Sequence, residues 1–532
     1  MDIKKTLKSL ENYLAVGTSL SIIYTIAFHL QTFYMMVRIY NTTPFSSQWL
    51  GIFSELIIAL SCTSILFAIS WPSHYLRTII IPISFLFGSA SAYFSIELNR
   101  LLTSDLIRDF FNVENDLTLE LITPQLIAAT SASLIASLLL LKYSSLIIKF
   151  YKRNKPYRIF VLFCIAISIS SVILDMSFRS QHLTSASKNY MPFSFFVHLG
   201  KYALQTKKFS EANNHKLDLS KEFSWYYNQP EPMTVVFVIG ESLRADKLSL
   251  NGFKTNTTPN LSSEQNLISF PNFWSLYGTT KYAIPTMMTR LSSIDPELPI
   301  NEKSFISIYK ALGFQTAWIG IQGIYGQYDH TYGSIALEAS TVIEKSDIKA
   351  GIDNKKYDEY LLPIAEQFLQ EQAHTNNLLV FHMIGSHWPF DKRYPDKFRV
   401  LQPSCSGSAS NCSDIEITNS YNNSILYSDW VLGQLINMLK DRNAILIFSS
   451  DHGISLKEDG AFGAESLTNH KSLNVATFIW FSNRYAQKNP LKIEKLRLMR
   501  NERHTHQNLF HTILGCSNIE SDAITARLNL CK

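Results

Sequence analysis

Long apolar segments with almost no charge dominate the first 180 residues of the chain. Each is about 20 residues long, which is enough for a helix to cross a hydrocarbon core of roughly 30 Å. The segments lie at about 13–36, 49–71, 75–95, 120–142 and 157–177. A buried helical bundle is the alternative, but runs such as SLIASLLLL carry no charge at all. We therefore predict five transmembrane helices in residues 1–180.

Basic residues between these segments predict the orientation. They precede the first segment or lie in the second and fourth connections: Lys4, Lys5, Lys8, Arg77, Lys149, Lys152, Arg153 and Lys155. All fall on one side of the membrane if the N-terminus is cytoplasmic, as the positive-inside rule requires. We expect the chain after about residue 180 to lie on the opposite, extracytoplasmic side.

The pattern changes after a connector that we place at 181–230, whose aromatic stretch at 190–197 could lie along the membrane surface. Short apolar runs typical of buried strands then alternate with helical patterns. These runs are TVVFVIG (234–240), FQTAWIG (314–320), NLLVFHMIG (377–385), AILIFSS (444–450) and ATFIWFS (476–482). Strands alternating with helices predict an α/β domain with a mostly parallel central sheet, here over 231–532.

Two of the predicted strands end in residues that suit a metal ion. Glu241 follows the first strand, and Asp451 with His452 follows the fourth. Ligands of open α/β sheets bind outside the carboxyl ends of the strands, so these side chains should converge on one crevice. Carboxylate oxygens and imidazole nitrogens are ligands of divalent metals. A single acidic residue after a strand is often only a helix cap or a solvated turn, but two such strand ends together favour a metal site.

A threonine pair, Thr279-Thr280, lies between these two strands in the sequence. A hydroxyl at the start of a helix lies among free backbone N–H groups that favour an anion such as phosphate. A metal would lower the pKa of such a hydroxyl and make it a nucleophile. Taken alone, the pair is equally consistent with simple helix capping.

Composition and cysteine usage agree with a membrane-anchored protein. Apolar residues make up 46% of the chain and charged residues 17%, and the net charge of +5 comes mostly from the basic loops, so we expect no nucleic-acid partner. Cys62 and Cys164 fall inside predicted spans. The pairs 405/412 and 516/531 each bracket a short segment and predict two disulfides in an oxidising compartment. Zinc-binding cysteines are the alternative, but no C-x-x-C spacing supports them.

Motifs spread along the chain resemble those of the membrane-anchored phosphoethanolamine transferases, a family that includes the lipid A-modifying enzymes behind colistin resistance. The segments that carry the resemblance are GESLRAD (240–246), SLNGF (249–253), TTPNL (257–261), GSHWP (385–389), RYP (393–395), NSYNNSILYSD (419–429), SDHG (450–453) and NLFHT (508–512). The resemblance runs from the predicted spans to near the C-terminus, and together these motifs are highly specific.

The resemblance implies an alkaline phosphatase/sulfatase fold and zinc-dependent transfer of phosphoethanolamine from phosphatidylethanolamine, through a covalent threonine intermediate, to an envelope acceptor such as lipid A or the lipopolysaccharide core. It also implies a bacterial inner-membrane protein, monomeric, with a periplasmic catalytic domain. The implied zinc ligands are Glu241, Thr280, Asp451 and His452, with Thr280 as nucleophile. The implied substrate-binding residues are His387, also the general acid, His470, and a lipid-facing helix with Asn112, Asp116 and Glu120.

Some positions depart from the family pattern. The usual second histidine after Asp-His-Gly is Ala464 here, with His470 as the nearby substitute, and a usual lysine is Tyr325. No cysteine flanks Thr280, unlike in the lipid A enzymes. We therefore expect one zinc site and leave a second zinc and the acceptor open. A phosphoglycerol transferase acting on an envelope glycan, or an inactive membrane scaffold or transporter, are the alternative functions.

Overall fold

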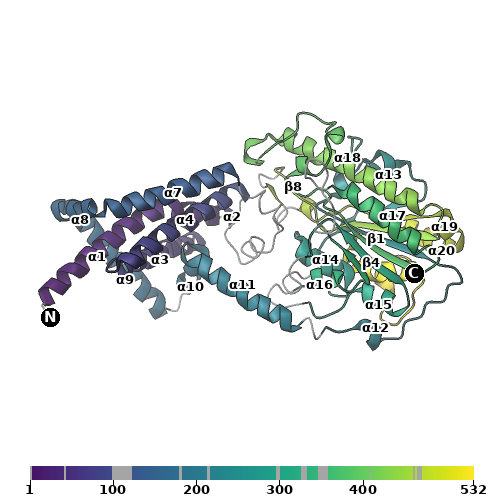
Figure 1. The fold of residues 1–532 in the computed structure, drawn as a ribbon, viewed down its shortest axis with the longest axis horizontal. Coiled ribbons are helices and arrows are strands. Elements are labelled where there is room, and N and C mark those ends of the chain that lie inside the picture. Colours follow the sequence, from purple (N-terminus) through teal and green to yellow (C-terminus); the bar gives the residue numbers. More distant parts are fainter. Residues whose placement is uncertain are drawn as a thin grey trace. The chain divides into compact units, whose positions relative to one another are not determined.

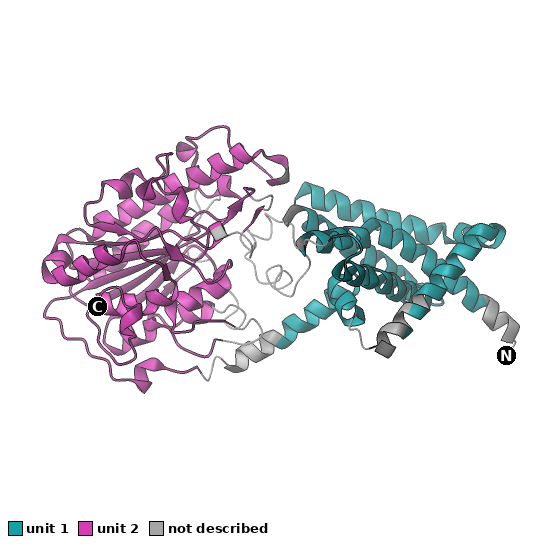
Figure 2. Ribbon diagram, turned by 180° about the vertical axis from the view of Figure 1, so that it is seen from behind, with its two compact units in different colours: residues 1–204 teal, residues 205–532 magenta. Residues whose placement is uncertain are grey.

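The computed structural model describes residues 3–40, 43–98, 123–178, 182–212, 216–294, 300–324, 332–344, 357–407, 409–458, 462–463 and 470–532. Its chain forms two compact units, Met1–Leu204 and Gln205–Lys532, which are coloured separately in Figure 2. The two units are described in turn.

The first unit consists of helices. They are α1 (Ile3–Tyr24), α2 (Leu30–Ile39), α3 (Ser47–Ser70), α4 (His74–Leu98), α7 (Pro124–Lys142), α8 (Ser144–Arg153), α9 (Lys155–Phe178), α10 (His182–Asn189) and the start of α11 (Phe193–Ala212), with a π-helical turn η1 (Thr25–His29) joining α1 to α2. Among the described residues, four segments are long and apolar enough to cross a membrane: Ser9–Arg38, Ser47–Ser70, His74–Ile96 and Pro124–Lys142. They coincide with the first four predicted spans, and the fifth predicted span lies within α9.

Several hydroxyl groups inside the first unit are satisfied within their own helix. The hydroxyls of Ser19, Ser61 and Ser84 each donate to the carbonyl oxygen four residues earlier in their own helix, at 2.6 to 2.7 Å. Helices α1 and α3 approach closely at Gly17, where a Cβ atom would lie 2.6 Å from the backbone nitrogen of Ala68. Local hydrogen bonding and close backbone approach are the usual means of packing helices in lipid, where no water can satisfy a buried polar group.

The second unit is built on a seven-stranded sheet with the order β2-β10-β7-β1-β6-β4-β5 (Figure 1). Its strands are β1 (Thr234–Gly240), β2 (Leu267–Ser269), β4 (Gln315–Gly320), β5 (Thr341–Ile343), β6 (Asn377–His382), β7 (Ala444–Ser450) and β10 (Thr477–Phe481). Strands β7, β1, β6, β4 and β5 pair in parallel, whereas β10 is antiparallel to both β7 and β2. The mostly parallel sheet predicted from the sequence is confirmed.

Helices cover both faces of this sheet, as Figure 1 shows. On one side Val235, Phe237 and Ile239 of β1 pack in a core with α14 (Thr280–Met288), α15 (Phe305–Ala311) and α21 (Gln507–Cys516). On the other side Val236 and Val238 pack in a core with α17 (Leu362–Glu371) and α18 (Asp414–Leu439). Burial on both faces explains why the strands appear as continuous apolar runs.

All five strands predicted in this unit are present, two with the predicted ends and three with ends shifted by one to three residues. The largest shift is in β6, which ends at His382 because the chain then turns sharply toward the neighbouring strand end. Both predicted disulfides, Cys405–Cys412 and Cys516–Cys531, are confirmed. Two of the strands that complete the sheet, β2 and β5, are only three residues long and carry no comparable apolar run.

Candidate metal centre and nucleophile

The pairing of β1 with β7 brings the two acidic strand ends together. The strands are parallel neighbours, and Gly240 is aligned with Ser450. Glu241 and Asp451, the next residue of each strand, therefore leave the sheet side by side, and both side chains are almost fully buried. The strand-end rule thus predicted this juxtaposition from residues that lie far apart in the sequence.

A strained turn fixes the two carboxylates. Ser242 has a φ of 58°, a left-handed conformation that costs energy for a residue with a side chain. This conformation lets its backbone N–H donate to Asp451 Oδ1 at 3.1 Å and its hydroxyl to Glu241 Oε1 at 2.6 Å. Tyr421, on α18, donates its hydroxyl to the Ser242 carbonyl at 2.7 Å. These three hydrogen bonds fix the turn beside the two carboxylates.

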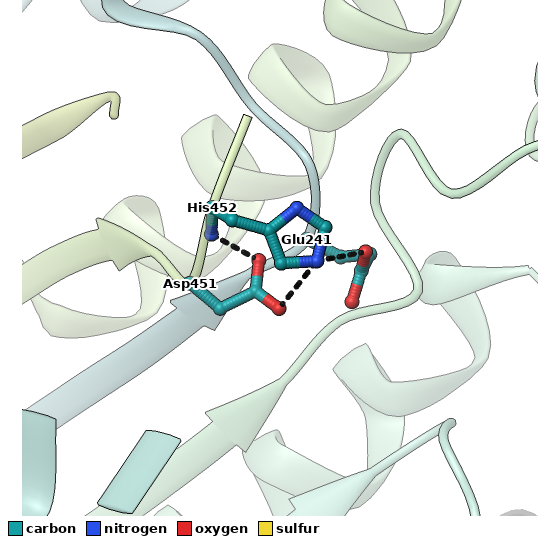
Figure 3. A group of neighbouring side chains, drawn as sticks. All are labelled: Glu241, Asp451 and His452. Carbon is teal, nitrogen blue, oxygen red and sulfur yellow. Dashed lines mark hydrogen bonds and ion pairs between the residues drawn. The ribbon is translucent and has the colours of Figure 1, made fainter. Parts of the chain in front are cut away.

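The spacing of the donor atoms fits a metal ion. Glu241, Asp451 and His452 offer ligand atoms that all lie within 4.8 Å of one another (Figure 3). His452 Nε2 is 3.5 Å from Glu241 Oε1, 3.4 Å from Asp451 Oδ2 and 3.3 Å from Thr280 Oγ1. Neighbouring ligands placed tetrahedrally about 2.1 Å from a zinc ion are about 3.4 Å apart. The three distances from His452 Nε2 are therefore close to the spacing expected around a tetrahedral zinc ion.

Two further details favour a cation at this point. His452 Nδ1 lies 2.8 Å from the carbonyl oxygen of Gly453, so a proton on Nδ1 donates to this oxygen and Nε2 is the ring atom left to bind a cation. Asp451 Oδ2 is buried and has no hydrogen-bond donor. A buried carboxylate oxygen without a donor is costly unless a cation compensates it.

The pKa values of the two carboxyls diverge. Burial and the negative charge of Glu241 raise the pKa of Asp451 to about 7. Burial opposes ionisation of Glu241 as well, but the positive charges of His452 and His387 outweigh it and lower the pKa of Glu241 to about 2. Without a cation, full ionisation of both carboxyls is therefore unfavourable near neutral pH, and a bound divalent ion would favour it.

Thr280 meets this cluster at the first residue of α14. Its hydroxyl donates to Glu241 Oε2 at 3.1 Å. The preceding Thr279 is the N-cap, but its side chain makes no capping hydrogen bond, and its hydroxyl is buried without a partner. The structure thus separates the two threonines: Thr280 contacts the candidate ligands, whereas Thr279 does not interact with them through its hydroxyl.

The loop after β6 carries His387 and is attached to the metal-site backbone. Asp358 accepts the backbone N–H groups of Ile384 and Gly385 at 2.8 and 3.0 Å. Gly385 has a φ of +48°, and a Cβ atom there would lie 3.0 Å from the Glu241 carbonyl oxygen, so this turn requires glycine. His387 itself is partly buried, with Nδ1 2.5 Å from the Trp388 carbonyl oxygen.

The remaining predicted site residues lie largely outside the described part of the chain. His470 begins a short 3-10 helix, η10 (His470–Ser472), but its side chain is not described. Asn112, Asp116 and Glu120 all lie outside the described residues, as do Ala464 and Tyr325. The roles assigned to these residues stay predictions.

Two site residues were missed from the sequence. Gln322, two residues after β4, donates to Glu241 Oε2 at 3.1 Å and to the Met383 carbonyl at 2.8 Å. His506 is buried behind Asp451, with Nε2 3.0 Å from the Ser450 carbonyl oxygen. The strand-end rule could have identified Gln322, because β4 lies in the same sheet, but no local pattern indicates His506.

A second buried charge cluster adjoins the first. The Arg244 side chain is fully buried and forms ion pairs with Asp246 at 2.7 Å and with Glu458 at 2.9 Å. Lys247 lies 3.5 Å from Glu458. Burial opposes ionisation of Glu458, but the hydrogen bonds and charge of Arg244 lower its pKa to about 2. This cluster is balanced by its own cations, unlike the carboxylates around His452.

A mostly parallel sheet with two carboxylates, an imidazole and a hydroxyl at its carboxyl edge is typical of metal-dependent enzymes that process phosphate or sulfate esters. The sequence profile of the sulfatase family matches residues 233–519, more than half of the chain. The chain belongs to the sulfatase family.

Relatives and solved structures extend this similarity. Over 341 residues the chain is 29% identical to a Kdo(2)-lipid A phosphoethanolamine 7''-transferase of Escherichia coli K12, which corresponds to 62% of this chain and 60% of that protein. The full-length fold is similar to that of the integral membrane protein lipooligosaccharide phosphoethanolamine transferase A (EptA) from Neisseria meningitidis, with a TM-score of 0.75, 19% identity and coverage of 97% of this chain and 98% of that one. The periplasmic domain of EptC from Escherichia coli, solved in complex with zinc, matches 58% of this chain and 89% of that domain, with a TM-score of 0.52 and 21% identity.

Proposed function

We propose that the protein transfers phosphoethanolamine from phosphatidylethanolamine to an envelope acceptor such as lipid A or the lipopolysaccharide core. The observation that carries this proposal is the position of the Thr280 hydroxyl, within 3.3 Å of both Glu241 and His452 at the beginning of a helix. A nucleophilic alcohol, candidate metal ligands and free helical N–H groups then share one site. The names of the relatives described above support this choice of group and acceptor.

We propose zinc as the cofactor, in one site formed by Glu241, Thr280, Asp451 and His452. Oxygen and imidazole donors at these spacings suit it, and a zinc-bound relative supports it. When bound, zinc would neutralise charge on a phosphate and lower the pKa of a coordinated hydroxyl.

In the first half of the reaction, Thr280 Oγ1, which has already lost its proton to solvent, attacks the phosphorus of phosphatidylethanolamine. A bond forms between Oγ1 and phosphorus, the bond from phosphorus to the glycerol oxygen breaks, and diacylglycerol leaves. The hydrogen bond from Thr280 to Glu241 orients the hydroxyl, and the backbone N–H groups at the start of α14 face the phosphate oxygens. Covalent capture on Thr280 divides one difficult transfer into two easier steps.

His387 acts as general acid and then as general base in this proposal. It donates a proton to the departing glycerol oxygen and then accepts one from the acceptor hydroxyl, which attacks the phosphorus and releases Thr280. The Asp358 and Gly385 contacts hold the His387 loop against the backbone of Glu241. They therefore fix the position of this loop relative to the residue that orients Thr280. The Arg393 side chain donates to the His387 carbonyl at 3.0 Å and holds the loop from the other side.

We also propose that the first unit anchors the enzyme in the bacterial inner membrane, where the donor lipid resides, with the N-terminus in the cytoplasm and the catalytic unit in the periplasm. The four apolar helical segments and the two disulfides of the second unit support this arrangement. The domain limits expected from the sequence, 1–180, 181–230 and 231–532, and the monomeric state stay predictions.

The test compares two adjacent threonines in full-length protein purified in detergent. Thr280→Ala should reduce diacylglycerol release from labelled phosphatidylethanolamine by at least about a thousandfold, because it removes the nucleophile. Thr279→Ala is the matched control and should retain activity within about threefold, because its hydroxyl has no partner to lose. Mass spectrometry of the wild-type enzyme without acceptor should locate one phosphoethanolamine group on Thr280.

Full activity in Thr280→Ala would contradict the proposal. Preferred consumption of phosphatidylglycerol over phosphatidylethanolamine would contradict the proposed donor and favour the phosphoglycerol transferase alternative.

A further inference from the structure

The side chain of Trp388, the residue that follows His387, packs against two other aromatic rings. Its ring centroid lies 5.0 Å from that of Phe390 and 4.7 Å from that of Phe462, with interplanar angles of 90° and 76°. Edge-to-face contacts of this kind favour one relative orientation of the rings. The Trp388 ring is therefore fixed by one residue of its own loop and by one residue much later in the chain.

The contact with Phe462 connects the His387 loop to the segment that carries two of the candidate metal ligands. Phe462 lies in β9 (Phe462–Gly463), which pairs antiparallel with β8 (Ser455–Leu456). Strand β8 begins three residues after His452, so the hairpin follows the ligands closely in the chain. One ring contact of Trp388 is thus made with the segment that continues from the metal site.

The contact with Phe390 leads to the turn that holds the two carboxylates. The ring centroids of Phe390 and Tyr421 are 5.0 Å apart. Tyr421 donates its hydroxyl to the Ser242 carbonyl at 2.7 Å and accepts the backbone N–H of Arg244 at 3.0 Å. Both aromatic neighbours of Trp388 therefore connect the His387 loop with the backbone of the metal site, by two separate routes.

The backbone of Trp388 orients the His387 ring. His387 Nδ1 lies 2.5 Å from the Trp388 carbonyl oxygen, so a proton on Nδ1 donates to this oxygen. The ring nitrogen that exchanges protons with a substrate is then Nε2. The Arg393 guanidinium donates to the same carbonyl oxygen at 3.2 Å and to the His387 carbonyl at 3.0 Å. The direction of the His387 ring therefore depends on where the Trp388 carbonyl is held.

We propose that Trp388 is a positioning residue, whose ring, held by Phe390 and Phe462, fixes the carbonyl oxygen that orients His387. The inference rests on the function proposed above, in which His387 protonates the departing glycerol oxygen. A purely structural role would affect every reaction of the site alike. A positioning role affects mainly the protonation, because the proton has to reach one particular oxygen within hydrogen-bond distance.

The experiment compares two donors with different leaving groups. Thr280 attacks the phosphorus of both, but the glycerol oxygen of phosphatidylethanolamine needs a proton, whereas p-nitrophenyl phosphoethanolamine releases p-nitrophenolate, a stable anion at neutral pH. Single-turnover rates are measured without acceptor in full-length protein in detergent. Trp388→Leu should slow diacylglycerol release at least about tenfold more than p-nitrophenolate release, because only diacylglycerol release uses the acid. Phe462→Leu should show the same preference to a smaller extent, because it removes one of the two ring contacts.

Trp430→Leu is the matched control, since Trp430 is also partly buried against the same core. Its ring contacts Phe398 and Tyr427 instead of Phe390 and Phe462. This variant should slow the two reactions by the same factor.

A second variant tests whether Trp388 acts through His387. In a His387→Gln background, Trp388→Leu should add less than about threefold to the loss of diacylglycerol release, because the group that it positions is absent.

Equal slowing of the two reactions in Trp388→Leu or in Phe462→Leu would overturn the inference. A full additional loss of diacylglycerol release in the His387→Gln background would overturn it as well. Neither result would contradict the proposed function, because Thr280→Ala would still abolish both reactions. A wild-type protein that releases neither diacylglycerol nor p-nitrophenolate would instead contradict the proposed function, and this inference with it.

Discussion

Two groups of charged residues, each with a buried member, lie within a few residues of each other in the second unit, yet they are built in opposite ways. Around Arg244, a fully buried guanidinium meets Asp246 and Glu458, and Lys247 lies nearby, so cations and anions balance. Around His452, the ion pairs that the described residues form with Glu241 and Asp451 come from an imidazole alone, and Asp451 Oδ2 has no hydrogen-bond donor.

The difference indicates which cluster needs a ligand. A buried charge is tolerated when it is paired and hydrogen-bonded, and Arg244 meets that condition with groups of the protein itself. The Glu241 cluster does not, because burial and the charge of Glu241 raise the pKa of Asp451, whereas only His452 and His387 favour the charge on Glu241 enough to lower its pKa. A divalent cation supplies the missing charge, and the predictions below test this asymmetry.

The largest effect is expected for metal binding. Asp451→Asn should lower zinc affinity by more than about a hundredfold, because loss of a direct ligand should exceed the 10- to 100-fold typical of outer partners. Competition with a chromogenic chelator measures this in the detergent-solubilised full-length protein. Glu458→Gln, which alters the balanced cluster, is the control and should bind zinc as the wild type does. Equal affinities in Asp451→Asn and the wild type would contradict the assignment of the unbalanced cluster.

Breaking the balanced cluster should cost stability instead. Arg244→Met removes the charged hydrogen bonds to Asp246 and Glu458, which stay partly in contact with solvent, and should destabilise the protein by about 2 kcal/mol. A fall of several degrees in the thermal midpoint would report it. Arg484→Met is the control, because Arg484 is largely exposed, pairs with Glu231 at the surface and should contribute under about 1 kcal/mol. Equal midpoints for the two variants would show that Arg244 does not hold its cluster together.

Whether Asp451→Asn stabilises or destabilises the protein should depend on bound metal. In chelator-treated protein, Asp451→Asn should raise stability by about 1 kcal/mol, because it removes the repulsion between Glu241 and Asp451. In zinc-saturated protein the same substitution should lower the thermal midpoint, because bound metal stabilises the native state through its affinity. Thermal unfolding with and without zinc measures both. Destabilisation under both conditions would argue for a purely structural role of Asp451.

The smallest effect is a pH dependence in the balanced cluster. The pKa of Glu458 is lowered to about 2 from an ordinary value of 4.5, so its contribution to stability is present above pH 4.5 and is lost as the pH falls through about 2. Glu458→Gln should remove this part of the acid dependence and flatten the curve of unfolding free energy between these pH values. Denaturant unfolding at several pH values measures it, and parallel curves for the variant and the wild type would contradict the role of Glu458.

Sequence reasoning succeeded where a local pattern coincides with a geometric rule. The apolar runs that end at Gly240 and Ser450 identified two buried strands, and the carboxyl-edge rule then placed Glu241 beside Asp451. The two disulfides followed similarly from the short spacing of the cysteines in each pair.

Sequence reasoning failed where a contact depends on how distant loops pack. The pairing of Arg244 with Glu458 joins residues 214 positions apart, and neither side chain lies in a periodic segment. The antiparallel direction of β10 depends on its partners β7 and β2, because its apolar run is equally compatible with a parallel strand.

The most direct test is the anomalous scattering of a crystal of the zinc-loaded protein at the zinc absorption edge. The account predicts a strong peak enclosed by the side chains of Glu241, Asp451 and His452, with Thr280 Oγ1 in contact. A map with no peak there, or with its strongest peak elsewhere in the catalytic unit, would contradict it.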